Sequence, residues 1–264
     1  MNLDFSDDQK FLQSEARKFL EKEGSLGRNR EVLDNKMSLD NELWKKIISM
    51  GWTGIRIPEE YEGLGLGHLE LCVVAEELGR ALAPVPFSSS VYLFTETIIK
   101  YASEDIKKDI LPKLVSGECV GTLAVTEDLL APTESNISVT SVNNKVTGTK
   151  IAVPDAGIAS HAVVVCKGDN GVELRLVELK QENCIVSNQE NIDESRGHFS
   201  IEFNNVDSQL IGEVGNGWEF LQSILNQAAV LFSKLVEPKQ LLIWQIIMQK
   251  KDLHLAAQLA HTKP

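Results

Sequence analysis

Apolar residues in the first 118 positions recur at the spacing of amphipathic helices. The first stripe follows a Ser6-x-x-Gln9 pattern typical of a helix N-terminus, and Pro84 ends the third. A fourth lies between Ser103, a suitable N-cap, and Gly117, and Pro112 is expected to kink it. The stripes are Phe11, Leu12, Ala16, Phe19 and Leu20; Leu43, Ile47 and Met50; Leu71, Val74, Leu78 and Leu82; and Ile106, Ile110 and Leu114. Residues 1–118 are therefore predicted to form an all-α domain.

Short β-branched runs replace the helical stripes after Glu118. Asn143-Asn144 and Asp169-Asn170-Gly171 supply turns between them. The expected strands are Cys119–Thr126, Ile137–Val142, Lys145–Lys150, Ala162–Cys166, Val172–Leu179 and Phe199–Phe203. The pattern predicts an antiparallel β-domain over residues 119–216.

Helical periodicity returns after the sequence GEVGNGW at residues 212–218. A helix is predicted from Trp218 to about Phe232, with Leu221, Ile224, Leu225 and Ala228 on one face. Trp218 itself is interpreted as an anchor for the start of this helix in the core. The fold class is therefore α+β and multidomain, with helices, then strands, then a helix.

Composition narrows the function classes. A chain of 264 residues with 43% apolar content can bury a sizeable core, and a net charge of −12 argues against nucleic acid as a partner. No apolar stretch approaches the roughly 20 residues that span a bilayer, so no membrane span is expected. The acidic start MNLDFSDDQK is unlike a signal peptide, which favours a cytoplasmic protein. Four scattered cysteines are typical of reduced thiols.

Several polar groups are given structural interpretations. The GLGLG sequence at residues 63–67 follows no strand of the dinucleotide-binding type, so turn geometry is the preferred explanation. Glu59-Glu60 and Glu76-Glu77 are interpreted as solvated charges. The histidines lack companions at metal-ligand spacing, and no metal site is predicted; they include His68, His161 and His198.

Six motifs occur in the order found in one family. They are PEEYEGLGLG at 58–67, EELGRALAPVP at 76–86, LPKLVSGE at 111–118, LAVTE at 123–127, TGTKIAVPDA at 147–156 and GEVGNGW at 212–218. Over residues 1–232 the chain resembles the acyl-CoA dehydrogenases. The resemblance implies an all-α N-terminal domain, a middle β-domain and a C-terminal helical bundle, with FAD held between them. It also implies α,β-desaturation of an acyl-CoA thioester, an electron-transfer flavoprotein or similar acceptor, and homo- or hetero-oligomers.

The implied chemistry defines the candidate site. Removing a proton beside a thioester needs a carboxylate base and hydrogen bonds to the developing enolate oxygen, and the flavin must lie against the β-carbon. By motif, Leu123, Val125 and Thr126 would lie along the flavin, with the Thr126 hydroxyl bonded to the ring. The residues at its other side would be Ala152, Val153 and Pro154. No catalytic residue is assigned, because the family's base lies in the C-terminal bundle.

Two departures from the family pattern leave the substrate open. Residues 128–133 read Asp-Leu-Leu-Ala-Pro-Thr where the family commonly has a P-x-A-G-S-D loop that encloses the thioester. Ala152 and Pro154 replace the tryptophan and threonine that many members place against the flavin. The VPDA sequence at 153–156 resembles a subgroup associated with unusual acyl chains and unequal paired subunits. One alternative function is therefore a non-catalytic partner subunit of a heteromeric acyl-CoA dehydrogenase.

The last part of the chain does not continue the family pattern. Residues 217–233 fit the first helix of the bundle, but residues 234–264 show no clear helical face. Reading each codon's third base with the next two bases, Ile247 to Pro264 permits Tyr-Ala-Lys-Glu-Arg-Phe-Ala-Phe-Gly-Arg-Pro-Ile-Gly-Ser-Tyr-Lys-Ala, which contains the family's missing FGRP motif. We therefore expect a net frameshift near Phe232 to Lys234, with residues 234–264 out of frame.

Such a chain lacks most of the bundle, and with it the base and an arginine for the FAD pyrophosphate. We expect weak or no FAD binding, an exposed apolar face on the helix ending near Phe232, and no activity of the chain alone. A non-functional truncated product is the remaining alternative.

Sequencing the coding DNA around Phe232 tests the frameshift hypothesis. We expect an uninterrupted family reading frame in the third register from about Lys234 onward. Stop codons or unrelated residues in that register would contradict it.

Overall fold

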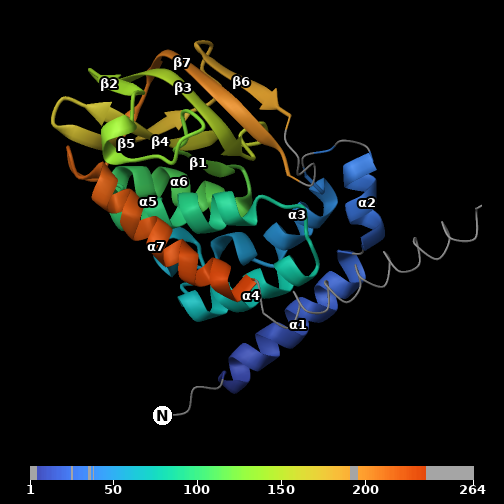
Figure 1. The fold of residues 1–264 in the computed structure, drawn as a ribbon. Helices are drawn as coiled ribbons and strands as arrows, with labels where there is room; N and C mark the ends of the chain where they lie inside the picture. Colours follow the sequence, from blue (N-terminus) through green and yellow to red (C-terminus); the bar gives the residue numbers. More distant parts are fainter. Residues whose placement is uncertain (1–4, 25, 35–36, 38, 191–195, 236–264) are drawn as a thin grey trace, which may run out of the picture.

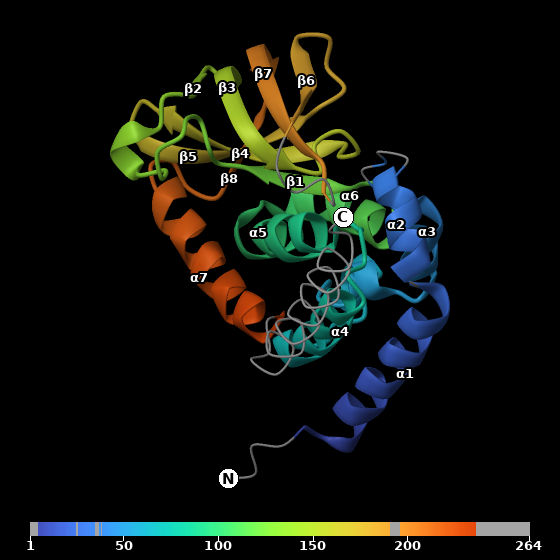
Figure 2. The ribbon, with the colours of Figure 1, turned by 45° about the vertical axis from the view of Figure 1, so that its right-hand side comes forward.

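The computed structural model describes residues 5–24, 26–34, 37, 39–190 and 196–235. Helices form one layer, a β-sheet lies against it, and a final helix runs along the outside of the helical layer (Figures 1 and 2). The chain thus has an N-terminal helical domain, a β-sheet domain and one further helix, as the sequence predicts. Among the described residues no helix is long and apolar enough to cross a membrane.

The helices follow the predicted stripes and caps. They are α1 (Asp7–Glu23), α2 (Leu26–Asp34), α3 (Asn41–Ser49), α4 (His68–Arg80), the π-helix η3 (Phe87–Phe94), α5 (Thr95–Tyr101), α6 (Glu104–Ser116) and α7 (Gly217–Leu235). Ser6 and Gln9 form a reciprocal capping box at α1. Ser103 caps α6, and Gly117 ends it with a φ of 76°, a left-handed conformation that favours glycine. Helix α2 and the η3–α5 segment were not predicted.

The GLGLG segment is a turn, as expected. Gly65 has a φ of 60°, and a Cβ atom at Gly63 would lie 2.0 Å from the carbonyl oxygen of Ile57. The backbone is so close here that only glycine fits. Two short 3-10 turns precede this segment, at Trp52–Gly54 and Glu59–Tyr61, and α4 follows it.

The strands form an eight-stranded sheet in the order β6-β7-β3-β2-β4-β5-β8, with β1 paired to β4. They are β1 (Gly121–Ala124), β2 (Thr140–Val142), β3 (Lys145–Pro154), β4 (His161–Gly168), β5 (Gly171–Glu178), β6 (Cys184–Gln189), β7 (His198–Asp207) and β8 (Gln209–Ile211). Most pairs are antiparallel as predicted, but β1 and β2 each pair with β4 in parallel. The sequence did not predict β6 or β8.

One apolar cluster joins the helices to the sheet. It combines Ile98 of α5 and Ile110 of α6 with Val163 of β4, Leu174 of β5 and Leu221 of α7. A second cluster fills the space between α1, α3, α4 and η3, and a third lies within the β-domain. Each fully buried side chain of this size contributes roughly 1.5–3 kcal/mol. The two domains therefore share a core.

Helix α7 differs from expectation. Leu221, Ile224 and Ala228 are buried against the helical and β-domains, and only Leu225, at 36% exposed, remains partly open. The prediction that this apolar face is exposed is therefore wrong for the described part of the helix. Phe220 stacks on Tyr101 with ring centroids 4.1 Å apart, and Trp218 packs against the shared cluster.

Glu77 also differs from expectation. The sequence indicated a solvated charge, but this side chain is fully buried between α1 and α4. Arg17 Nη2 lies 2.6 Å from Glu77 Oε1, and Arg80 Nε lies 2.8 Å from Oε2. Burial alone would raise the pKa of the Glu77 carboxyl, but the hydrogen bonds from both arginines bring it below its usual value. Glu59 and Glu60 are exposed, as expected.

We predict that Glu77→Gln lowers the free energy of unfolding by about 3 kcal/mol, because it leaves two guanidinium groups without their buried carboxylate. Urea denaturation followed by circular dichroism measures the change. Glu15→Gln is the control, since the partner of Glu15 among the described residues is Lys18 on the exposed surface, where such pairs contribute about 0–1 kcal/mol. Equal effects of the two substitutions would contradict the prediction.

Candidate functional site

Two segments that are far apart in the sequence meet at the end of β1. Residues 125–127 continue from β1, and the backbone N–H of Ile151 donates to the Thr126 carbonyl over 2.8 Å. This joins the two groups of residues that the motifs assigned to a flavin. The structure therefore brings together the LAVTE and TKIAVP motifs.

A bulge shapes the second segment. The β3–β7 pairing shifts register between Lys150 and Val153, and Ala152 has a φ of 51°, which L-residues seldom adopt. The Ala152 N–H no longer pairs with β7; it donates instead to Oε1 of Gln189 on β6 over 2.7 Å. The bulge thus takes Ala152 out of the β3–β7 ladder.

The six predicted residues differ in accessibility. Leu123 and Val153 are 5% and 1% exposed, so their side chains belong to the core and only their backbone could face a ligand. Val125, Thr126 and Pro154 are half-buried, and Ala152 is exposed. We call the surface formed by Val125, Thr126, Ala152 and Pro154 the candidate surface.

Thr126 provides a polar group on the candidate surface. Within the described part of the chain, its hydroxyl has no hydrogen-bond partner, whereas its carbonyl is used by Ile151. A half-buried hydroxyl of this kind can donate to or accept from a bound molecule.

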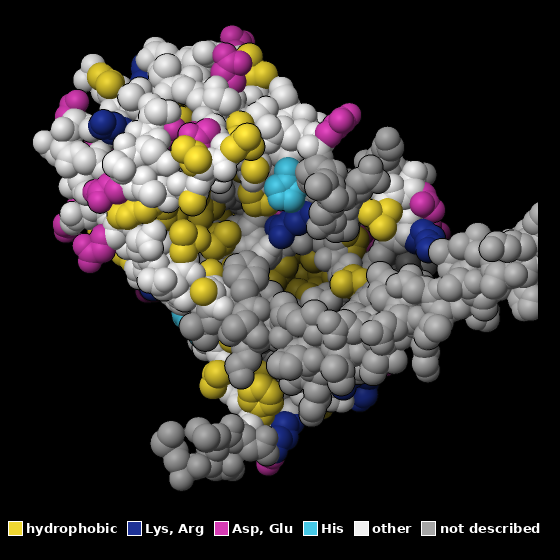
Figure 3. Space-filling view, in the orientation of Figure 1, with side chains coloured by type: hydrophobic (Ala, Val, Ile, Leu, Met, Phe, Trp, Pro, Cys, Tyr) yellow, Lys and Arg dark blue, Asp and Glu magenta, His cyan; other side chains and the backbone are white. Residues whose placement is uncertain are grey.

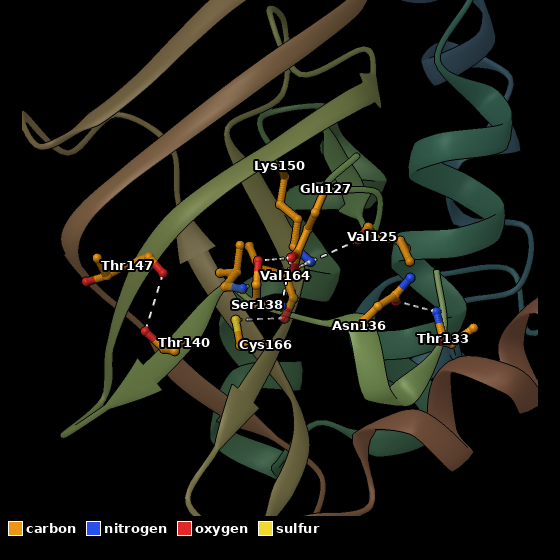
Figure 4. Close-up of polar contacts among 11 residues, drawn as sticks. Val125, Glu127, Thr133, Asn136, Ser138, Thr140, Thr147, Lys150, Val164 and Cys166 are labelled. Atoms are coloured by element: carbon orange, nitrogen blue, oxygen red, sulfur yellow. Dashed lines mark hydrogen bonds and ion pairs between the residues drawn. The ribbon is translucent and has the colours of Figure 1, made fainter. Parts of the chain in front are cut away.

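A buried ion pair, Lys150–Glu127, lies next to Val125 at one end of the candidate surface (Figure 4). Lys150 Nζ, which is fully buried, lies 2.6 Å from Glu127 Oε1 and also donates to the Val125 carbonyl over 2.9 Å. The Glu127 carboxylate accepts hydrogen bonds from the hydroxyl and N–H of Ser138 and from the N–H of Val139. Burial would raise the pKa of the Glu127 carboxyl, but Lys150 and Ser138 together hold it below the usual value.

A second ion pair holds the other end of the surface. Asp155, next to Pro154 and 2% exposed, pairs with Arg196 Nη2 at 2.5 Å and accepts a hydrogen bond from the Ser89 hydroxyl, also at 2.5 Å. Ser89 belongs to η3 of the helical domain, so Asp155 links the helical domain to β3 and β7. Thr122 adds a hydrogen bond from its hydroxyl to the Pro154 carbonyl over 2.6 Å.

The altered loop at residues 128–133 is ordered by its own polar groups. Asp128 Oδ1 accepts from the Leu130 N–H over 2.7 Å, and Asn136 Nδ2 donates to the Ala131 carbonyl over 3.1 Å. Leu129 is fully exposed and Leu130 is 68% exposed. The recess beneath the loop has a volume of about 10 Å³, which holds at most one water molecule.

Hydrophobic side chains gather in the hollow between the β-domain and the helices (Figure 3). A separate groove of about 790 Å³ lies between α6 and the β5–β8 edge, and it contains none of the six predicted residues. His161 lines this groove, with Nδ1 3.0 Å from the Ser160 hydroxyl and 3.5 Å from Cys119 Sγ. Burial lowers the pKa of His161 and raises that of Cys119 to about 11, so neither group is activated.

The comparisons with known proteins agree with the motifs. Residues 6–118 match the family model of the acyl-CoA dehydrogenase N-terminal domain. The mitochondrial isovaleryl-CoA dehydrogenase of Solanum tuberosum is 35% identical over 127 residues, which are 47% of this chain and 30% of that protein.

Residues 6–118 of this chain belong to the acyl-CoA dehydrogenase N-terminal domain family.

Solved structures share the fold of this chain. Butyryl-CoA dehydrogenase from Megasphaera elsdenii matches with a TM-score of 0.80 at 22% identity, covering 89% of this chain and 66% of that one. The ChsE4-ChsE5 complex of Mycobacterium tuberculosis contains a chain with a TM-score of 0.78 at 20% identity, covering 100% of this chain and 69% of its own. The chain thus spans less than a third of the plant relative and about two thirds of these structures.

The sequence did not single out the residues that hold the acyl-CoA dehydrogenase motifs in place. Lys150 and Glu127 lie inside the quoted motifs, and a lysine directly before the apolar residues 151–153 is a signal for a buried partner. Nothing local signals that Asp155 reaches Ser89 and Arg196, because these residues are 66 and 41 positions away.

We predict that Asp155→Asn lowers the free energy of unfolding by about 2 kcal/mol, because it weakens charge-assisted hydrogen bonds between the domains. Equilibrium denaturation measures the effect. Asp169→Asn, on the exposed turn between β4 and β5, is the control and should change stability by less than about 0.5 kcal/mol. If Asp155→Asn also changes the free energy of unfolding by less than about 0.5 kcal/mol, the prediction is refuted.

Proposed function

We propose that this chain supplies one wall of the FAD site of an acyl-CoA dehydrogenase, for α,β-desaturation of an acyl-CoA thioester. The observation that carries the proposal is the pairing of Thr126 with Ile151, which joins the two family motifs into one surface. The domain boundaries near residues 118 and 216 are part of the same proposal. A cytoplasmic location stays a prediction, and the plant relative is a mitochondrial enzyme by name.

The residues present fit one face of a flavin. The candidate surface combines apolar atoms of Val125, Ala152 and Pro154 with the Thr126 hydroxyl, which has no partner among the described residues. Apolar contact with a few polar groups is typical of cofactor sites. When bound, FAD would accept the hydride from the substrate's β-carbon. An acyl-CoA dehydrogenase of Bacillus anthracis has been solved in complex with FAD, which supports the choice of cofactor.

The described residues next to this surface do not supply the base. Glu127 is held by Lys150, and Asp155 by Arg196, so both carboxylates are already paired. A general base must reach the substrate's proton and accept it. We therefore propose that the chain by itself does not convert acyl-CoA. In the family the base lies in the C-terminal bundle, which agrees with this proposal.

The acyl chain and the electron acceptor are further parts of the proposal. Leu129 and Leu130 present apolar surface at the loop that encloses the thioester in the family, so an apolar acyl group suits this side. A structure from the electron-transferring flavoprotein system of Acidaminococcus fermentans shares the fold, which supports a flavoprotein acceptor.

A second candidate function is that of a partner subunit in a heteromeric acyl-CoA dehydrogenase. The similarity to a chain of the ChsE4-ChsE5 complex favours it, because that structure contains two different subunits and covers the whole of this chain. In this arrangement the second subunit would supply the base and the remaining contacts to FAD.

Reconstitution with FAD tests the first proposal. The purified chain is incubated with FAD and then mixed with isovaleryl-CoA or butyryl-CoA. The flavin absorbance at about 450 nm is recorded over several minutes. We expect no acyl-CoA-dependent bleaching by the chain alone, because the described carboxylates beside the candidate surface, Glu127 and Asp155, are already paired. Bleaching without any partner would refute the claim of inactivity. Bleaching that appears only with a second subunit would establish the partner function.

A further inference from the structure

We propose that Lys150 and Glu127 are positioning residues for the candidate surface, and that their ion pair holds the Val125–Thr126 backbone against the β3 bulge. This proposal rests on the proposed function. Neither side chain would touch the flavin or the substrate; both would act through the backbone that faces them.

The contacts of Lys150 carry the first step. Its ammonium group bonds both the Glu127 carboxylate and the carbonyl of Val125, two residues earlier. Lys150 therefore fixes the direction of the chain between these residues, and Thr126 lies between the two contacts. The Thr126 carbonyl then accepts from Ile151, which follows Lys150 on β3. One side chain and one backbone bond thus hold the two segments together.

The contacts of Glu127 carry the second step. Its carboxylate accepts the N–H groups of Ser138 and Val139 over 2.7 and 3.1 Å, and these residues precede β2. The pair thus ties residues 125–127 to the start of β2 as well as to β3 (Figure 4). The chain between Glu127 and Ser138 includes the altered loop, so the same carboxylate fixes both ends of that loop.

The cost of burial carries the third step. Lys150 is fully buried and Glu127 is 9% exposed, and an ammonium group in such a place is stable only with its carboxylate. Replacing both charges by neutral groups can restore stability, whereas removing one leaves a buried charge. A positioning role can therefore be separated from a purely structural one by comparing a single with a double substitution.

Another buried ion pair in the same domain offers a matched control. Arg175 Nη2 lies 2.6 Å from Glu173 Oε2 on β5, with side chains 8% and 5% exposed. Arg175 also donates from Nη1 to Oδ1 of Asn144, in the turn between β2 and β3, over 2.8 Å. Among the described residues, neither side chain forms an ion pair with Lys150 or Glu127. Arg175→Met therefore removes a buried cation from the β-domain without breaking the contacts of the candidate surface.

Amide hydrogen exchange on the full-length chain tests the proposal without FAD. We compare Lys150→Met, the double variant Lys150→Met/Glu127→Gln and Arg175→Met, normalising the exchange of the Ile151 amide to that of Ile110 in α6. We expect the Ile151 amide to exchange about tenfold faster in both Lys150 variants, even where the double variant regains stability, and to change less than threefold in Arg175→Met. Slow Ile151 exchange in the double variant would overturn the proposal, and so would equal acceleration in Arg175→Met.

Titration with FAD, followed by quenching of flavin fluorescence, adds the functional readout. Where the wild-type chain binds FAD, we expect the double variant to raise the Kd about tenfold and Arg175→Met to leave it within threefold. An unchanged Kd with fast Ile151 exchange would overturn the positioning role. A wild-type chain that binds no FAD would count against the proposed function alone, and the exchange result would then decide whether the pair orders these segments.

Discussion

The hydrophobic cluster between α5, α6 and the β4–β5 face is the interaction on which the rest of the structure depends. Its side chains come from both domains and from α7, so each of the three parts buries some of its apolar surface against the others. Because the burial of each large apolar side chain contributes roughly 1.5–3 kcal/mol, this shared core outweighs any single polar contact across the domains. It fixes the β-domain against the helices and thereby determines where the end of β1 lies.

The candidate surface uses this rigid support. Thr126 and Ala152 belong to irregular backbone just beyond β1 and within the bulge of β3, where the regular ladder no longer satisfies every N–H and C=O group. The missing partners are supplied by Lys150, Gln189 and the backbone of Ile151. Buried polar groups must be paired to be tolerated, and here the pairing also determines which groups face outward. Polar contacts thus orient a surface whose location is set by apolar packing.

Charge plays different roles in the two domains. In the helical domain, Arg17 and Arg80 converge on Glu77 and join α1 to α4, far from the candidate surface. In the β-domain, the pairs Lys150–Glu127 and Asp155–Arg196 lie at the two ends of the candidate surface. The paired carboxylates order the backbone. Under the proposed function, desaturation would therefore need a different carboxylate as its base, and the described part of the chain would form one wall of the cofactor site.

The sequence by itself determined the elements that depend on neighbouring residues. The helical stripes, the capping box of Ser6 and Gln9, the stop at Gly117 and the β-branched runs each act over a few positions, and the order of six motifs identified the family. Only the tertiary structure decided that Glu77 is buried, that α7 covers its apolar face and that Asp155 meets Ser89 and Arg196. These outcomes depend on which surfaces come together in the folded chain. Burial by a distant segment produces no periodic pattern or motif spacing in the sequence, so the sequence alone does not predict it. The same holds for the six predicted site residues. The motifs indicated which residues to expect at the site, but packing decided that Leu123 and Val153 are buried in the core while Thr126 is half-buried.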